Sequence, residues 1–268
     1  ILGQATGQPV GRLLGGRYRD RVKPYASLLM EEPAMLRQHL LELKAQGFRA
    51  FKMGWGPVGR VSTELDEAIV RTARETVGRD TLLMVDAGGS DAFWHQGYKW
   101  ALRSAQMLAA YDVAWFEEPL APDALEDYVR LRVAAPLPIS GGEVLTRRQA
   151  FRSWIEAGAL DIVQPDVTKV GGITESRRIA WMAQDHGIRF IPHGWNTAVG
   201  LAADLQLASA FSDTDLVEYI TGSAYVDELK AGGWHLDDEG FLPIPDKPGL
   251  GIELDADAVS RYTRGQWQ

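Results

Sequence analysis

Short apolar runs alternate with helix-like segments along most of the chain. The runs are mostly apolar through their length, which is typical of parallel strands that are buried on both faces. They predict eight strands, at residues 25–29, 48–53, 82–86, 113–117, 137–143, 161–166, 188–193 and 215–220.

The segments between these runs carry apolar residues at helical spacing. The clearest helix is predicted to begin at Glu64, with Thr63 and Asp66 placed like a capping box and Gly78 suited to its end. Further helices are predicted at residues 33–46, 94–108, 125–131, 147–157 and 173–186.

This alternation predicts an α/β protein with a parallel sheet and crossover helices. Eight strand–helix units in 268 residues favour closure into one barrel. An open, doubly wound sheet is the alternative, but no G-x-G-x-x-G segment follows the first strand.

Composition narrows the class of function. The chain is 46% hydrophobic, enough for a large core, and it has no cysteine, so disulfides and thiolate metal sites are excluded. The net charge of −8 without a basic block argues against nucleic acid or an anionic membrane surface as partner. No signal peptide or long apolar run is present, so a cytoplasmic location is the default. A small anionic substrate would need a local cation.

Most predicted strands end at or near a polar residue that can act in catalysis or bind a ligand. In a barrel the carboxyl ends of the strands meet on one face, where such enzymes build their sites. The residues concerned are Lys52, Asp86, Glu117, Glu143, Asp166, His193 and Glu218.

Three of these residues, Asp86, Glu117 and Glu143, are carboxylates at successive strand ends. An all-oxygen set suits Mg²⁺ or Mn²⁺ better than zinc. Three solvated acids in surface loops are the alternative, but each acid follows an apolar run, and buried acids are almost always paired or metal-bound. Glu117 and Glu118 are adjacent, so strand alternation sends only one of them into the barrel mouth.

The remaining polar ends have less specific signals. A lone His193 would more often be a core histidine, but Asp166 on the neighbouring strand end can fix its tautomer and raise its basicity. Lys52 either extends to solvent or contacts a substrate anion.

Taken together, the strand ends resemble those of the enolase superfamily, mandelate racemase subgroup. The likeness covers nearly the whole chain and implies a modified TIM barrel of (β/α)7β type. The matching segments are "AFKMGWG", "MVDAGGS", "WFEEPL", "ISGGE", "QPDVTKVGGIT", "IPHGWN" and "LVEYI".

The resemblance assigns a role to each strand end. It implies that the shared reaction is removal of a proton α to a carboxylate, with Mg²⁺ stabilising the enediolate. The implied Mg²⁺ ligands are Asp86, Glu117 and Glu143. The implied catalytic residues are His193 as base, Asp166 as its partner, Glu218 and Lys52 near the substrate carboxylate, and Lys169 in a role left open.

Two departures from the subgroup pattern direct the choice of reaction. In the subgroup, the second lysine of the Lys-x-Lys segment is the base that removes the proton from the opposite face of the substrate, and Gly54 occupies its position in this chain. Gly88 occupies a position at which Asn or His is common. We therefore expect dehydration of a sugar acid to a 2-keto-3-deoxy acid. The alternatives are a racemase or epimerase, in which Lys52 could be the second base, and a noncatalytic barrel that binds metal and carboxylate.

The resemblance also predicts a division of the chain. Residues 1–16 would be the helix tail and linker that follow an N-terminal capping domain absent from this sequence. Residues 17–222 would be the catalytic barrel, and 223–268 a tail that packs on the barrel and cap side. A homo-oligomer is expected.

Overall fold

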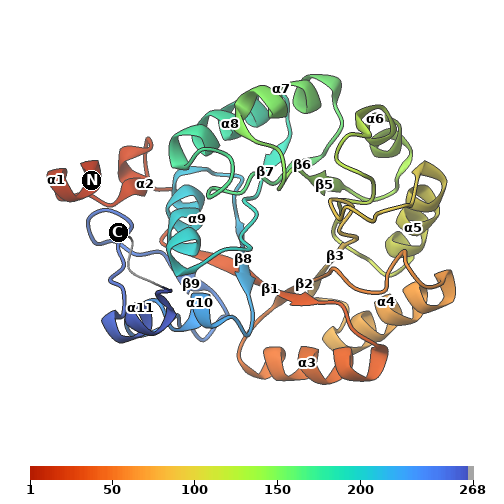
Figure 1. The fold of residues 1–268 in the computed structure, drawn as a ribbon, viewed down its shortest axis with the longest axis horizontal. Helices are drawn as coiled ribbons and strands as arrows, with labels where there is room; N and C mark the ends of the chain where they lie inside the picture. The colour runs from red at the N-terminus through yellow and green to blue at the C-terminus, as the bar shows by residue number, and fades with distance from the viewer. Residues whose placement is uncertain (265–268) are drawn as a thin grey trace.

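The protein is described by a computed structural model in which residues 1–264 are placed. Residues 265–268, the end of the predicted tail, lie outside this described part. Figure 1 shows a ring of strands surrounded by helices. The strands are β1 (Arg21–Leu29), β2 (Ala50–Gly54), β3 (Leu82–Asp86), β4 (Phe116–Glu117), β5 (Ile139–Gly141), β6 (Ile162–Val163), β7 (Arg189–Phe190) and β8 (Leu216–Ile220).

Seven helices connect these eight strands, which confirms the predicted (β/α)7β barrel. All ladders between the eight strands are parallel, in the order β7-β6-β5-β4-β3-β2-β1-β8. The helices are α3 (Pro33–Ala45), α4 (Thr63–Val77), α5 (Tyr98–Ala110), α6 (Leu125–Ala134), α7 (Arg147–Ala157), α8 (Ile173–Asp185) and α9 (Ala198–Ala210).

The ring closes without a backbone ladder at one place. Within the described residues, β7 and β8 share no paired positions, although they are the two ends of the strand order. The hydroxyl of Thr214, just before β8, donates to the carbonyl of Phe190 in β7 at 2.8 Å. A side chain thus links the two strands where the other neighbours use backbone pairs.

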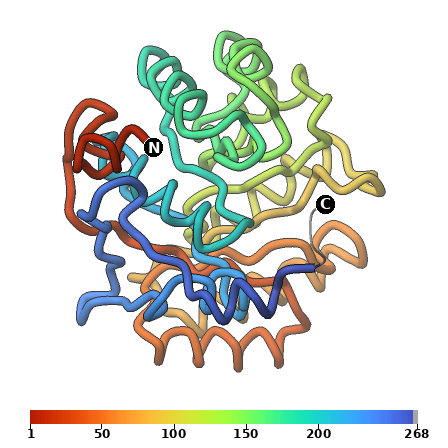
Figure 2. Tube along the Cα trace, turned by 60° about the vertical axis from the view of Figure 1, so that its left-hand side comes forward, coloured from red at the N-terminus to blue at the C-terminus, as the bar shows by residue number. Residues whose placement is uncertain are grey.

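The segments outside the barrel lie together on one side of it, as the red and blue ends in Figure 2 show. Gly11 of the N-terminal segment donates to the Gln206 side chain on α9 at 2.7 Å, and Pro9 bridges to Gly249. Residues 1–16 contain two short helices. The outer elements are α1 (Leu2–Thr6), α2 (Val10–Leu13), α10 (Ala224–Asp227), β9 (Leu242–Pro243) and α11 (Ala256–Tyr262).

Several predicted boundaries shift for local reasons. Strand β1 begins at Arg21 because Arg21 and Val22 pair with β9. The capping-box prediction is wrong: Ser62 caps α4, its hydroxyl accepting from Leu65 N, while Asp66 accepts from Gly59 N at 3.0 Å. Gly78 does end this helix, with φ 88°.

Helix α9 has a different character from the outer helices. Twelve of its thirteen residues are buried, so it has no polar face. In the described residues, no helix is both long and apolar enough to cross a membrane.

Candidate active site

Three acids converge at the carboxyl ends of neighbouring strands. Asp86 ends β3, Glu117 ends β4 in register with it, and Glu143 follows β5. One carboxylate oxygen from each lies within 4.8 Å of the others, and all three side chains are buried. The structure therefore brings together the three predicted metal ligands.

Two residues that the sequence analysis did not single out hold Glu117 in place. Trp115 Nε1 and Gln164 Nε2 both donate to Glu117 Oε2, at 3.0 and 2.8 Å. Trp115 lies two residues before Glu117, and Gln164 two before Asp166. Because side chains alternate along a strand, this spacing puts each on the same face as a predicted site residue, and it was the available signal.

The second acid of the adjacent pair, Glu118, lies apart from the three ligands. Its backbone takes the left-handed region, with φ 41°, and its side chain is buried. Burial, and next the charge of Glu143, raise the pKa of Glu118 to about 7. Among the described residues the metal-sized cluster contains Glu117 and not Glu118, in keeping with strand alternation.

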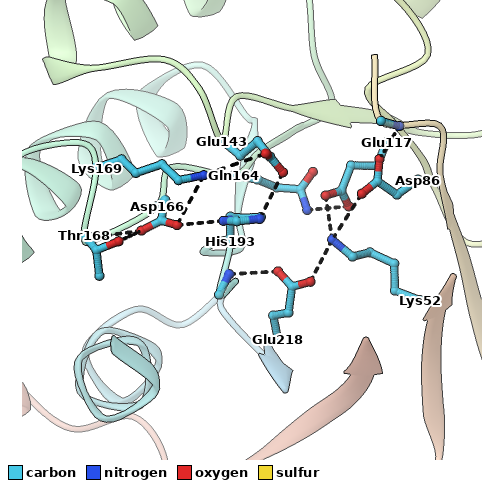
Figure 3. Close-up of polar contacts among 12 residues, drawn as sticks. Lys52, Asp86, Glu117, Glu143, Gln164, Asp166, Thr168, Lys169, His193 and Glu218 are labelled. Atoms are coloured by element: carbon cyan, nitrogen blue, oxygen red, sulfur yellow. Dashed lines mark hydrogen bonds and ion pairs between the residues drawn. The ribbon is translucent and has the colours of Figure 1, made fainter. Parts of the chain in front are cut away.

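His193 and Asp166 form a hydrogen-bonded pair beside this cluster (Figure 3). Asp166 Oδ2 lies 2.8 Å from His193 Nδ1, and the two residues form a parallel bridge that extends the β6–β7 pairing. Thr168 N donates to the other carboxylate oxygen of Asp166 at 2.7 Å. His193 Nε2 lies 3.0 Å from Glu143 Oε2, so the edge of the ring away from Asp166 faces the acid cluster.

Electrostatics at His193 are dominated by carboxylates. Burial lowers the pKa of His193, but Glu218, Asp166 and Glu143 together raise it well above its ordinary value. Burial raises the pKa of Asp166, but the hydrogen bonds from His193 and Thr168 and the charge of His193 together lower it below its ordinary value. The pair is thus built to hold a proton on the ring beside an ionised carboxylate.

Lys52 joins the two sides of the site. Its Nζ lies 2.6 Å from Glu117 Oε1, 2.9 Å from Glu218 Oε1 and 3.9 Å from Asp86 Oδ2. Gly194 N donates to the other oxygen of Glu218 at 2.8 Å. Burial raises the pKa of Glu218, but Lys52 and His193 bring it down to about 2. Glu218 is therefore ionised and orients Lys52.

Lys169, whose role the sequence left open, lies at the edge of the pair. Its Nζ is 3.7 Å from both Glu143 Oε1 and Asp166 Oδ2. It lines a cavity of about 340 Å³ together with Lys52, Asp86, Glu143 and His193. A cavity of this size fits a small molecule.

The residues present fit a divalent cation. The cluster offers only carboxylate oxygens, which hard cations prefer. Burial, and next the charge of Glu117, raise the pKa of Asp86 well above its ordinary value, which shows how unfavourable the grouped negative charges are alone. A cation held by Asp86, Glu117 and Glu143 would offset the negative charge of these three acids. It would thereby also reduce the effect of Glu143 on the pKa of His193.

This barrel, with acids on three successive strand ends and a His–Asp pair on the far side, defines an enolase-type α/β barrel. Residues 35–258 match the family model described as Enolase C-terminal domain-like, and the chain belongs to that family. The family is one of enzymes that use a divalent metal.

The curated relatives include two kinds of sugar-acid enzyme. The chain is 33% identical to D-galactarolactone cycloisomerase of Agrobacterium fabrum, over 98% of this chain and 70% of that protein. It is 32% identical to D-galactonate dehydratase of Variovorax paradoxus, over 98% of this chain and 71% of that protein.

Solved structures place the fold in the same group. The 3,6-anhydro-D-galactonate cycloisomerase from Zobellia galactanivorans superposes with a TM-score of 0.87 at 33% identity, covering 97% of this chain and 71% of that one. A mandelate racemase/muconate lactonizing enzyme from Sulfitobacter gives 0.86 at 29% identity, covering 99% and 71%. These comparisons confirm the resemblance drawn from the strand ends.

The buried acid Asp204, behind the site, is expected to make the stability of the protein depend on pH. Asp204 on α9 is fully buried, and neither of its carboxyl oxygens has a hydrogen-bond partner within the described part of the chain. Burial, and next the charge of Asp166, raise the pKa of Asp204 well above its ordinary value. The folded protein thus binds this proton more tightly than the unfolded chain, and stability falls as pH rises above the unfolded pKa of about 3.9.

Asp204→Asn should remove this loss. We expect the variant to gain stability relative to the parent between pH 4 and pH 8, by about 1 kcal/mol or more at pH 8, a size typical of a buried group without a partner. Urea unfolding across this range measures the difference. The exposed Asp238→Asn is the control. A constant difference at all pH values would show that Asp204 titrates alike in both states.

Proposed function

We propose that this protein removes the proton α to the carboxylate of a sugar acid and expels an oxygen from the β carbon. Dehydration to a 2-keto-3-deoxy acid is the form of this reaction that the sequence favours. The observation that carries the proposal is the His193–Asp166 pair, whose second ring nitrogen, Nε2, faces the cluster of Asp86, Glu117 and Glu143. The named relatives include D-galactonate dehydratase.

Asp86, Glu117 and Glu143 would hold Mg²⁺, with Mn²⁺ as a substitute. When bound, the cation supplies a Lewis acid that binds the substrate carboxylate and stabilises the charge that develops there. Trp115 and Gln164 keep Glu117 oriented by donating to its second oxygen.

The chain's own groups handle the proton. Asp166 fixes the ring of His193 through Nδ1, so that Nε2 accepts the α-proton. The protonated ring then donates to the leaving hydroxyl. Lys52, held by Glu117 and Glu218, places a positive charge beside the substrate carboxylate.

The racemase alternative needs a base on the opposite face. Burial lowers the pKa of Lys52, but Glu117 and Glu218 raise it well above its ordinary value, so the amine is charged and a poor base. A Cβ at Gly54 would lie 3.0 Å from Asp86 Oδ2, leaving little room for a base there. These two observations favour elimination.

Proton exchange in D₂O tests the proposal and separates the alternatives. With Mg²⁺ and a panel of aldonic and aldaric acids, we expect loss of the α-proton signal together with a keto-acid product. Exchange with inversion and no keto acid would support a racemase. If no acid gives exchange or product, the result would support the third alternative, a noncatalytic barrel that binds metal and carboxylate.

The remaining expectations follow from the sequence. The proposed partner is a small carboxylate, and the net charge of −8 argues against nucleic acid. The cytoplasmic location, the homo-oligomer and the division at residues 16 and 222 stay predictions.

A further inference from the structure

The loops that follow β2 and β3 are joined by one side chain, that of Arg60. The two strands are neighbours in the ring (Figure 1), and Asp86 of the acid cluster ends β3. Arg60 Nη1 donates to the carbonyl oxygens of Gly56 and Ala87, at 3.3 and 3.1 Å. Its Nη2 pairs with Asp91 Oδ2 at 3.1 Å. The guanidinium therefore ties the loop after β2 to the turn that begins directly after Asp86.

The turn at residues 87–91 orients the Asp86 carboxylate. Gly88 N donates to Asp86 Oδ1 at 2.7 Å, which restrains rotation of the carboxylate. Asp91 N donates to the carbonyl oxygen of Gly88 at 3.0 Å and closes the turn. Arg60 contacts this turn at its first and last residues, so it holds in place the peptide group that donates to Asp86.

Gly88 suits this turn because of its backbone conformation and its close neighbour. Its φ of 64° lies in the left-handed region, which favours glycine. The ring of Trp55, which itself has a φ of 51°, packs against it, and an added Cβ at Gly88 would lie 3.0 Å from Trp55 Cδ2. The turn is thus covered by Trp55 and held by Arg60.

Arg60 is itself held on a rigid support. Gly59 N donates to Asp66 on α4 at 3.0 Å, and Gln96 Nε2 donates to the carbonyl oxygen of Gly59 at 2.6 Å. The guanidinium lies 4.8 Å from the centre of the Trp94 ring. A guanidinium can stack on a ring and donate in several fixed directions at once, whereas the ammonium of a lysine is a compact point charge. The contacts of Arg60 therefore need an arginine.

We propose that Arg60 is a positioning residue for the divalent cation, because by holding the turn after β3 it keeps the Asp86 carboxylate in the orientation in which the cation binds. The inference rests on the metal site of the proposed function, since it uses the same cluster of three acids. Arg60 is not among the described residues that line the cavity, so it acts through Asp86. Groups that orient a metal ligand from outside contribute to metal affinity in this way.

Arg74 on α4 offers a matched control, because it makes the same kind of link at the opposite end of β3. It donates to the carbonyl oxygens of Thr81, just before β3, and Asp112, before β4, at 2.8 and 2.9 Å. This arginine thus joins the loops at the amino ends of two strands whose carboxyl ends carry the acids. If Arg60 only stabilised the fold, Arg60→Lys and Arg74→Lys would act alike.

Calorimetric titration with Mg²⁺ tests the inference. We expect Arg60→Lys to raise the Kd for Mg²⁺ about tenfold or more, as the loss of an outer group that orients a ligand commonly does. This variant keeps the positive charge, so the change reports geometry. Arg74→Lys should lower the unfolding temperature, because it leaves carbonyl oxygens without donors, but should keep the Kd of the parent protein. Turnover by Arg60→Lys should recover at saturating Mg²⁺.

Asp91→Asn is a second variant, which weakens the same link from its other side and serves if Arg60→Lys does not fold. It should also raise the Kd for Mg²⁺, and the double variant should bind no more weakly than Arg60→Lys alone, because both changes remove one interaction. An unchanged Kd in the folded variants, or an equal rise in Arg74→Lys, would overturn the inference and leave the proposed function standing. No Mg²⁺ binding by the parent protein would overturn both.

Discussion

Replacing His193 with asparagine is expected to abolish α-proton exchange and turnover. His193 Nε2 is the one ring nitrogen that faces the acid cluster, and Asp166 occupies the other at 2.8 Å. An asparagine cannot accept the proton, so we expect a loss of about 10⁴-fold or more, as when a member of a catalytic triad is removed. Exchange in D₂O, followed by loss of the α-proton signal, measures it.

Two companion measurements make this result specific. His193 is outside the group of three acids, so Mg²⁺ binding by the variant should persist when followed by calorimetry. Asp166→Asn should also lose about 10⁴-fold, because the ring loses the carboxylate that fixes its tautomer. Near-normal exchange in His193→Asn would mean that another base exists, and the racemase alternative would then lead.

Mg²⁺ is expected to raise the thermal unfolding temperature, and Glu143→Gln is expected to remove most of this rise. Three buried carboxylates repel one another, and a cation that binds only the folded state stabilises it by about 2.7 kcal/mol at a hundredfold excess over Kd. For a chain of this size that is roughly 5–10 °C. Glu143→Gln removes the charge of one of the three acids in the cluster.

The control for the metal prediction is a glutamate away from the cluster. Glu126 on α6 is exposed, and Glu126→Gln should keep the full Mg²⁺ response. Thermal scans with 0 to millimolar Mg²⁺ measure both variants. An unfolding temperature that stays constant in the parent protein over the whole titration would count against a preformed site.

The strand ends were the most predictable part of the molecule. Asp86 and Glu117 each follow an apolar run, and they end β3 and β4. The apolar run predicts the strand, and the acid that ends the run predicts which side chain lies at the mouth of the barrel. In β6 and β7 the continuous ladder is only two residues long, so the predicted runs extend past it, although their last residues, Asp166 and His193, still pair as an isolated parallel bridge at the site.

Other features needed tertiary information. Helix α9 was not singled out, because burial on all sides leaves no 3.6-residue period for the sequence to show. The unpaired Asp204 went unnoticed for the same reason. The Trp55 ring depends on contact with Gly88, 33 positions further along the chain, and on a φ that no local pattern announces. Such contacts arise only when the strands assemble.

The missing ladder between β7 and β8 has a mechanical consequence for the site. Asp86 and Glu117 sit on strands that are stitched to both neighbours, whereas His193 follows β7, which within the described residues is paired on one side only. A tilt of His193, the proposed base, toward or away from β8 would therefore break no backbone ladder on that side, whereas the strands that carry Asp86 and Glu117 are held from both sides. Support from one side only for the proposed base, opposite a three-acid cluster on strands that are paired on both sides, would let one barrel adjust the approach of the proton acceptor as the ligand changes shape.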